Sequence, residues 1–290
     1  MSDRKEIKLI ECPRDAMQGW KHFIPTEEKI TYINQLLKVG FDTIDFGSFV
    51  SPKAIPQLRD TSEVLAGLDL SNTSSKLLAI VANTRGAEAA VEFEEINYLG
   101  YPFSISETFQ LRNTNATIQE SLIRVEEIQN LCERNHKKLV IYISMAFGNP
   151  YGDEWSSDVA IYWTGMLHRM GIKIIALSDT VGVSTADSIA YLFSNLIPRF
   201  NTIEFGAHLH STPDTRLEKI GAAYKSGCRR FDVAVHGFGG CPMANDDLVG
   251  NLSTESLIQF LDTNKLETNL NKTQLLECYS KANSVFPLHA

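Results

Sequence analysis

The sequence predicts a closed (β/α)₈ barrel, a TIM barrel, with an extra C-terminal helix. Three observations predict it: eight short apolar segments, a helical pattern after each of them, and a length of 290 residues. The apolar segments are rich in Ile, Val, Leu and Phe without strict polar alternation, as in parallel strands covered on both faces. Alternating strands and helices specify a parallel sheet, and eight of them at this length favour a closed barrel.

An open, doubly wound parallel sheet is the alternative architecture. Its common dinucleotide-binding form carries Gly-x-Gly-x-x-Gly directly after the first strand. No such motif follows residues 7–11. The closed barrel is therefore preferred.

The elements follow in chain order. We predict strands at residues 7–11, 43–46, 77–82, 103–106, 139–144, 174–177, 202–208 and 230–235. Between them we predict helices at 26–39, 61–68, 85–99, 117–135, 156–170, 185–196 and 214–226. Three of these helices stop at Gly40, Gly171 and Gly227, and glycine is the residue that most readily ends a helix. A last barrel helix follows Thr254, and a further helix after Asn271 is expected to pack across the barrel. All 290 residues form one domain.

The composition indicates a globular protein, with 43% hydrophobic and 21% charged residues. A net charge of -8 argues against nucleic acid as a partner, because phosphate binding needs a basic surface. No apolar run approaches the length of a membrane span, and the polar N-terminus lacks the apolar segment of a signal peptide. The five cysteines are widely spaced and include no Cys-x-x-Cys pair, which favours a reducing compartment. We expect a cytoplasmic protein.

The predicted seventh strand ends in His208-Leu209-His210. Residues i and i+2 of a strand point to the same face, with Cα atoms roughly 6–7 Å apart. Two imidazoles can therefore converge on one cation, and hard oxygen ligands beside them would favour Mg²⁺ or Mn²⁺ over a structural zinc. The alternative is that both histidines are ordinary polar residues satisfied by backbone groups.

Polar residues gather where the predicted strands end. In (β/α)₈ barrels the chemistry lies at these ends, on the loops that follow the strands. The candidates are Arg14, Asp15, Asp45, Ser48, Asn83, Glu107, Asp179, His208, His210 and Asn251, together with the glycine-rich segment 237–242. Cys241 follows two glycines, on a loop that could close over the site and deliver a proton. A buried, inert thiol is the alternative for this cysteine.

Several motifs resemble the 3-hydroxy-3-methylglutaryl-CoA lyase family, metal-dependent TIM-barrel lyases related to the Claisen-type synthases. The matching segments are Pro13-Arg14-Asp15-Ala16-Met17-Gln18, Ser48-Phe49-Val50-Ser51-Pro52-Lys53, Ser178-Asp179-Thr180-Val181-Gly182-Val183, His208-x-His210, Gly237-Phe238-Gly239-Gly240-Cys241-Pro242 and Gly250-Asn251-Leu252-Ser253-Thr254-Glu255. They cover nearly the whole chain. The resemblance implies a TIM barrel, an acyl-CoA substrate, and a divalent cation.

The resemblance also implies roles for single residues. The cation ligands would be Asp15, His208, His210 and Asn251, although the Asn251 amide could equally cap a helix starting near Ser253. Catalysis would rest on Arg14 at the thioester oxygen, Cys241 as proton donor, and His208 with Asp179 at the substrate hydroxyl. Substrate contacts would come from Arg14, Gln18, Asp45 and Ser48.

The sequence departs from the family pattern in places. Asp45 stands where the family has the longer Glu, and Cys12 precedes the proline where Gly is usual. Ala16-Met17 replaces Gly-Leu, and Ser211 to Asp214 depart from Asp-Thr-Tyr-Gly. His236 and Met243 replace Ala and an aromatic residue. These changes concern the shape of the substrate more than the metal ligands.

Three functions follow as expectations. The first is a retro-Claisen lyase that cleaves 3-hydroxy-3-methylglutaryl-CoA, or a close analogue, to acetyl-CoA and acetoacetate. The second is a Claisen-type synthase that joins acetyl-CoA to a 2-oxo acid. The third is a degenerate barrel kept as a binding protein. In each case we expect a homodimer or a larger homo-oligomer.

Overall fold

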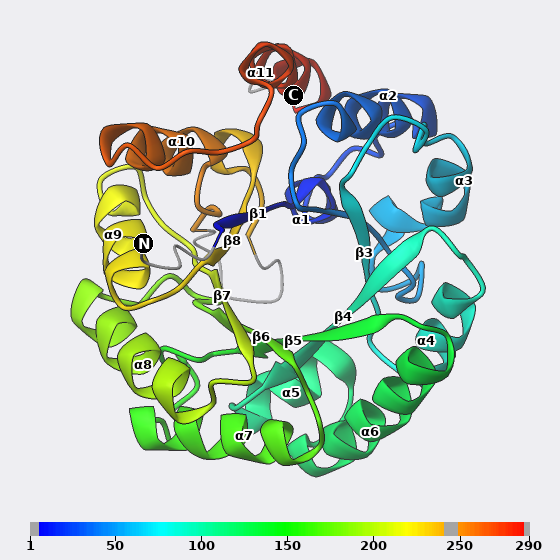
Figure 1. Ribbon diagram of the computed structural model, residues 1–290. Coiled ribbons are helices and arrows are strands. Elements are labelled where there is room, and N and C mark those ends of the chain that lie inside the picture. The colour runs from blue at the N-terminus through cyan, green and yellow to red at the C-terminus, as the bar shows by residue number, and fades with distance from the viewer. Residues whose placement is uncertain (1–5, 241–248, 287–290) are drawn as a thin grey trace.

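Eight parallel strands close into a barrel, as predicted (Figure 1). The computed structural model describes residues 6–240 and 249–286. The strands are β1 (Lys8–Glu11), β2 (Thr43–Ser48), β3 (Lys76–Ile80), β4 (Ile96–Ser104), β5 (Lys138–Ser144), β6 (Ile174–Ser178), β7 (Glu204–His208) and β8 (Arg230–Val233). Each strand pairs with the next along the chain, and β8 returns to pair with β1.

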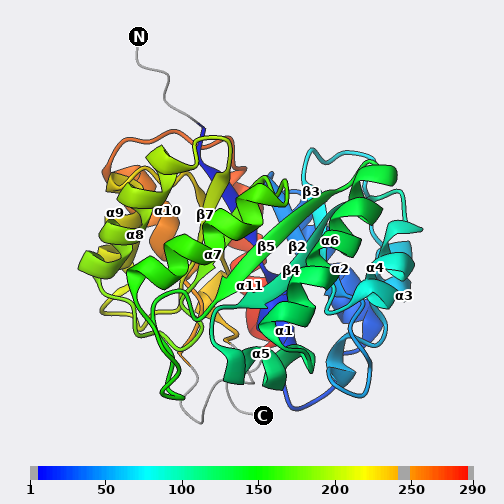
Figure 2. The same cartoon turned by 90° about the horizontal axis from the view of Figure 1, so that it is seen from below.

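Most of the helices surround the barrel on the outside, and α1 and α5 lie at its mouth (Figure 1). They are α1 (Pro13–Gln18), α2 (Thr26–Leu37), α3 (Thr61–Ala66), α4 (Thr84–Val91), α5 (Glu107–Thr114), α6 (Ile118–Arg134), α7 (Ser157–Arg169), α8 (Ala186–Arg199), α9 (Arg216–Lys225), α10 (Thr254–Thr263) and α11 (Lys272–Val285), with 3₁₀ turns η1 (Pro56–Leu58) and η2 (Val235–Gly237). Figure 2 shows α1 and α5 at the end of the molecule where the strands finish. Within the described residues, none of the helices combines the length and the apolarity that a bilayer span requires.

The prediction failed most clearly around the fourth strand. Residues 85–99 were expected to be one helix, but α4 ends at Val91 and β4 already begins at Ile96. The stretch Ile96–Leu99 pairs with β3 and β5 and is largely buried. A short apolar run fits a buried helix and a buried strand equally well, which explains the error. The short helices α1 and α5 were also not predicted.

The last helix lies in the outer ring and does not cross the barrel, so that expectation was wrong. Helix α11 runs beside α2, where the Gln35 amide donates to Gln274 and Glu277 (Figure 1). Its C-cap residue, Phe286, is fully buried and stacks edge-on against Trp20 at 5.5 Å. The helix therefore completes the ring between α10 and α2 and supports the segment that follows α1.

Helix α1 is fixed at the mouth of the barrel from both ends. The Cys12 N–H donates to the Val233 carbonyl, continuing the β1–β8 pairing, and Pro13 starts the helix at once. Beyond the helix, the Gln57 amide donates to the carbonyls of Trp20 and His22. A rigid α1 matters because this helix carries Arg14 and Asp15.

A buried ion pair strengthens this region, and its removal should be measurable. Lys29 Nζ lies 2.7 Å from Asp60 Oδ1, and both side chains are at most 5% exposed. Asp60→Asn should lower the free energy of unfolding by roughly 3 kcal/mol, the lower end for a broken buried pair, because Asn still accepts a hydrogen bond. Urea unfolding followed by circular dichroism measures this, and an unchanged midpoint would show that the pair contributes no net stability.

Candidate active site

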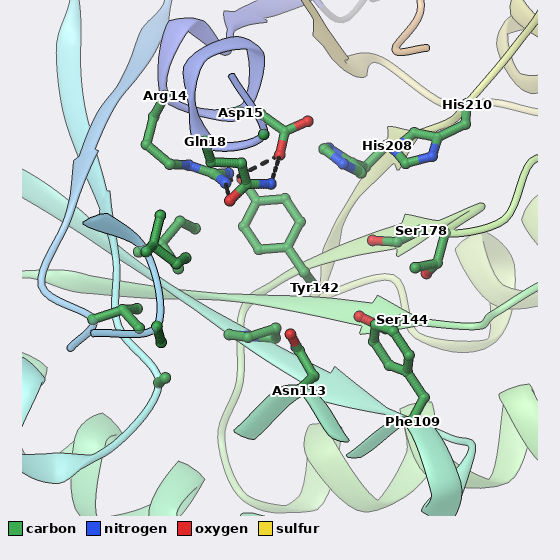
Figure 3. Close-up of a pocket in the computed structure, with 18 residues that line it drawn as sticks. Arg14, Asp15, Gln18, Phe109, Asn113, Tyr142, Ser144, Ser178, His208 and His210 are labelled. Carbon is green, nitrogen blue, oxygen red and sulfur yellow. Dashed lines mark hydrogen bonds and ion pairs between the residues drawn. The ribbon is translucent and has the colours of Figure 1, made fainter. Parts of the chain in front are cut away.

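A cavity of about 340 Å³ opens at the carboxyl ends of the strands (Figure 3). One wall is polar. Helix α1 contributes Arg14, Asp15 and Gln18 to it, β7 contributes His208, and His210 follows directly after β7. The facing wall is apolar and is formed by Val50, Ile55, Ile80, Ala82, Pro102 and Phe109. Between the two walls lie Asn113, Ser144, Ser178 and Thr180. The cavity therefore offers a charged side, an apolar side and a row of hydroxyl groups.

Asp15, His208 and His210 form a candidate metal centre. One ligand atom from each lies within 4.8 Å of the others. Burial would raise the pKa of Asp15, but Arg14 and the two imidazoles lower it below its usual value. Burial and the neighbouring His208 lower the pKa of His210 to about 4, so its imidazole is neutral at neutral pH. Its Nε2 is buried and has no hydrogen-bond partner among the described residues. A deprotonated carboxylate and an unpaired neutral imidazole are a donor set that fits a divalent cation.

Arg14 is held rigidly beside this centre. Its Nε and Nη2 both donate to Asp45, while its Nη1 donates to Asp15 and to the Gln18 amide oxygen. A guanidinium has five N–H groups, so these contacts use four of them. The remaining N–H, on Nη2, is available to a ligand in the cavity.

Two predicted substrate-binding residues lie behind the cavity wall. Asp45 is 1% exposed and accepts hydrogen bonds from Arg14 with both carboxylate oxygens. Burial raises the pKa of Asp45 to about 6, against the opposing effect of Arg14. Ser48 is also buried, and its Oγ accepts the Val50 N–H. The geometry gives both residues a positioning role, whereas Arg14 and Gln18 do line the cavity.

Asp179 also points away from the cavity. Its carboxylate accepts hydrogen bonds from Ser184 and from Lys219 Nζ at 2.7 Å, and it is not among the residues that line the cavity. Lys219 in turn donates to the His210 carbonyl at 2.8 Å. Asp179 is thus connected to the metal-centre side chains through Lys219 and the backbone, which the linear sequence did not indicate.

Asn251 lies directly against the candidate metal centre. Its Nδ2 donates to Asp15 at 2.6 Å and to the Phe238 carbonyl at 2.9 Å. The helix cap considered for it belongs to Ser253, whose side chain accepts the Ser256 N–H at the start of α10. Cys241, predicted as the proton donor, and Met243 lie outside the described residues.

Three other residues near the rim have structural partners. Asn83 caps α4 by accepting the Gly86 N–H, and Glu107 accepts the Ile118 N–H. His236 pairs with Glu255 at 2.8 Å and contacts the Tyr279 carbonyl. These contacts direct the three side chains toward helices. Position at a strand end was therefore not sufficient to identify a site residue.

Part of the cavity wall was not predicted from the sequence. Ser144 and Ser178 end two neighbouring strands, and the Ser178 Oγ is buried without a partner among the described residues. Tyr142 lines the same region, with its ring edge-on to His208 at 5.4 Å. The sequence signal that could have identified Ser144 and Ser178 is that each is a serine at the end of an apolar segment. Asp232, a charged residue inside the apolar β8, was also missed.

A comparison with models of protein families shows to which family the chain belongs. The model of the HMGL-like family matches residues 7–281. The chain belongs to the HMGL-like family. Members of this family generally depend on a divalent metal, which agrees with the donor set of Asp15, His208 and His210.

Curated relatives of this HMGL-like chain are lyases from bacteria and animals. A hydroxymethylglutaryl-CoA lyase of Bacillus subtilis is 34% identical over 94% of this chain and 90% of its own length. A mitochondrial hydroxymethylglutaryl-CoA lyase of Bos taurus is 33% identical over 94% of this chain and 83% of its own. A Pseudomonas aeruginosa enzyme named for both 3-hydroxy-3-isohexenylglutaryl-CoA and hydroxymethylglutaryl-CoA is 31% identical over 94% of this chain and 90% of its own.

A solved structure shows the same arrangement. The HMG-CoA lyase of Acinetobacter baumannii, in complex with coenzyme A and 3-methylmalate, superposes with a TM-score of 0.91 at 30% identity. The match covers 98% of this chain and 92% of that chain. The barrel of this HMGL-like protein therefore matches more than nine-tenths of that lyase chain.

Proposed function

We propose that the protein is a carbon–carbon lyase that cleaves 3-hydroxy-3-methylglutaryl-CoA, or a close 3-hydroxyacyl-CoA analogue, to acetyl-CoA and acetoacetate or the analogous ketone. One observation carries the proposal: Asp15, His208 and His210 surround one point beside Arg14, in a chain similar to lyases over nearly its whole length. The same cluster argues against a degenerate barrel. The relatives described above are lyases, which favours cleavage over the synthase reaction.

The proposed cation is Mg²⁺ or Mn²⁺, held by Asp15, His208 and His210 with Asn251 beside them. Bound there, it would orient the substrate and make its tertiary hydroxyl more acidic. Asn251 presents its amide nitrogen to Asp15, so its amide would have to turn to offer an oxygen ligand. The other three residues need no such change.

The geometry supports only one of the two roles predicted for His208. Its Nδ1 lies 3.1 Å from Asp232, and a carboxylate only accepts, so Nδ1 carries a hydrogen and, in the neutral imidazole that binds a cation, the lone pair is on Nε2. One lone pair cannot both bind a cation and take a proton. We assign it to the cation, so that the proton released by the substrate hydroxyl passes to solvent in the cavity. Asp179 then supports His210 through Lys219.

Arg14 is proposed to stabilise the charge that develops on the thioester oxygen as the C2–C3 bond breaks. Its four occupied N–H groups hold the guanidinium still, and the fifth can donate to that oxygen. Cys241 remains the proposed donor of the proton that the enolate carbon takes up. Gln18, Asp45 and Ser48 then bind the substrate indirectly, by fixing Arg14 and the cavity wall.

A cleavage assay tests the proposed function. Purified protein with Mn²⁺ and 3-hydroxy-3-methylglutaryl-CoA should release acetyl-CoA and acetoacetate in equal amounts, and a chelator should stop the release. Thioesters with longer apolar groups at C3 test the apolar wall opposite His208. Release of free thiol from acetyl-CoA with a 2-oxo acid, and no cleavage of any thioester, would instead identify a synthase. Cytoplasmic location and a homo-oligomeric state remain predictions.

A further inference from the structure

We propose that Asp232 is a positioning residue that holds His208 with its Nε2 lone pair toward the cation. This inference rests on the proposed metal centre and adds a residue to it that neither the motifs nor the comparisons indicated. Asp232 lies on β8, is 2% exposed and is not among the residues that line the cavity.

The hydrogen bond to Asp232 is what orients the imidazole. Among the described residues, the His208 side chain makes this single hydrogen bond, from Nδ1 to Asp232 Oδ2 at 3.1 Å. Two rings also contact it: Tyr142 lies edge-on at 5.4 Å and His210 at 5.6 Å. Ligand atoms of Asp15 and Cys12 lie within 4.8 Å of the imidazole but make no hydrogen bond to it. Ring contacts do not distinguish nitrogen from carbon in an imidazole. Without Asp232, a flipped ring and the other tautomer would both become accessible, and Nε2 would lose its lone pair in part of the molecules.

A buried arginine offsets the negative charge of Asp232. Arg230 lies two residues earlier on β8, so both side chains point to the same face. Burial lowers the pKa of Arg230, but Asp232 is the largest of the opposing effects and the net pKa is raised. Arg230 also donates to Glu204 at 3.2 Å, at the opposite end of the barrel from the cavity. The positive charge of Arg230 therefore offsets the negative charge of Asp232, and the Asp232 Oδ2 accepts from His208.

A second cation site is the competing explanation for the same residues. Cys12, His208 and Asp232 also place ligand atoms within 4.8 Å of one another. A cation there would need the Nδ1 lone pair, which the hydrogen bond to Asp232 replaces with a hydrogen. Burial and the charge of Asp232 raise the pKa of the Cys12 thiol well above its usual value, so it stays protonated at neutral pH. The contact between Asp232 and His208 is therefore better explained as a hydrogen bond that orients the imidazole than as part of a second cation site.

The test compares Asp232→Ala, Asp232→Asn and the wild type. Mn²⁺ affinity, from the electron paramagnetic resonance signal of the free ion, should fall roughly 10–100-fold in Asp232→Ala, the usual loss when such a partner is removed. Asp232→Asn retains an acceptor oxygen and should lose less. At saturating Mn²⁺ both variants should recover most of the wild-type kcat. Nitrogen NMR of the metal-free protein should show hydrogen on Nδ1 of His208 in the wild type and a mixture of tautomers in Asp232→Ala.

The matched control is Asp60→Asn, which also removes a buried carboxylate but lies outside the cavity. It should bind Mn²⁺ like the wild type despite its lower stability. Wild-type Mn²⁺ affinity and an unchanged tautomer in Asp232→Ala would overturn the proposal, and if that variant does not fold, the same two readouts in Asp232→Asn decide. Failure of the wild type itself to bind Mn²⁺ would instead refute the proposed metal centre.

Discussion

Replacing Asp15 or His208 with alanine is expected to abolish both metal binding and thioester cleavage. Each change removes one of three ligands whose atoms lie within 4.8 Å of one another. A cation contributes several kcal/mol to such a reaction, and each 1.36 kcal/mol is tenfold in rate, so turnover should fall roughly 10³-fold or more. Calorimetric titration with Mn²⁺ measures the first effect, and acetoacetate release measures the second.

A control is needed because Asp15 also accepts hydrogen bonds from Arg14, Gln18 and Asn251. Gln18→Ala removes one of these contacts without removing a cation ligand, and should keep Mn²⁺ affinity within a few-fold of the wild type. Full Mn²⁺ affinity in both Asp15→Ala and His208→Ala would contradict the ligand assignment.

Arg14→Lys is expected to leave metal binding nearly intact and to lower kcat by roughly 10²–10³-fold, as when an oxyanion donor is lost. Lysine keeps the positive charge beside Asp15 and Asp45 but cannot reproduce the fork that holds both Asp45 oxygens. The N–H proposed to donate to the thioester oxygen is then no longer fixed in direction. Steady-state kinetics at saturating Mn²⁺ measure the loss.

The split between kcat and metal affinity distinguishes this role from a structural one. A merely structural Arg14 would lower stability and Mn²⁺ affinity together while sparing turnover at saturating metal. A kcat for Arg14→Lys within threefold of the wild type would contradict the proposed contact with the thioester oxygen.

The barrel could be predicted because its signals are local. Apolar runs, glycines after helices and the order of elements all lie in short stretches of sequence, and the eight strands were confirmed close to the expected positions. The exception, residues 96–99, is an apolar run with no local feature that distinguishes helix from strand. Short helices such as α1 and α5 offer too few residues to show a period.

The candidate site was predictable only in part, for a related reason. Asp15, His208 and His210 lie close together because all strands of a closed barrel end at the same face, so that the fold alone brings these residues together. The directions of Asp179 and Asp45 depend on Lys219 and Arg14, partners that are 40 and 31 residues away. No spacing rule reveals such pairs. Asp232 was missed for the same reason, because its significance comes from its hydrogen bond to His208 on the neighbouring strand β7.

The central claim is that one divalent cation sits between Asp15 and the two imidazoles at the mouth of the barrel. The most direct test is a crystal structure of the protein soaked in Mn²⁺, with anomalous scattering used to locate the ion. The account predicts one strong peak bonded to Asp15, His208 and His210. A fully soaked crystal with no peak there, or with the ion bound to Cys12 and Asp232 instead, would contradict it.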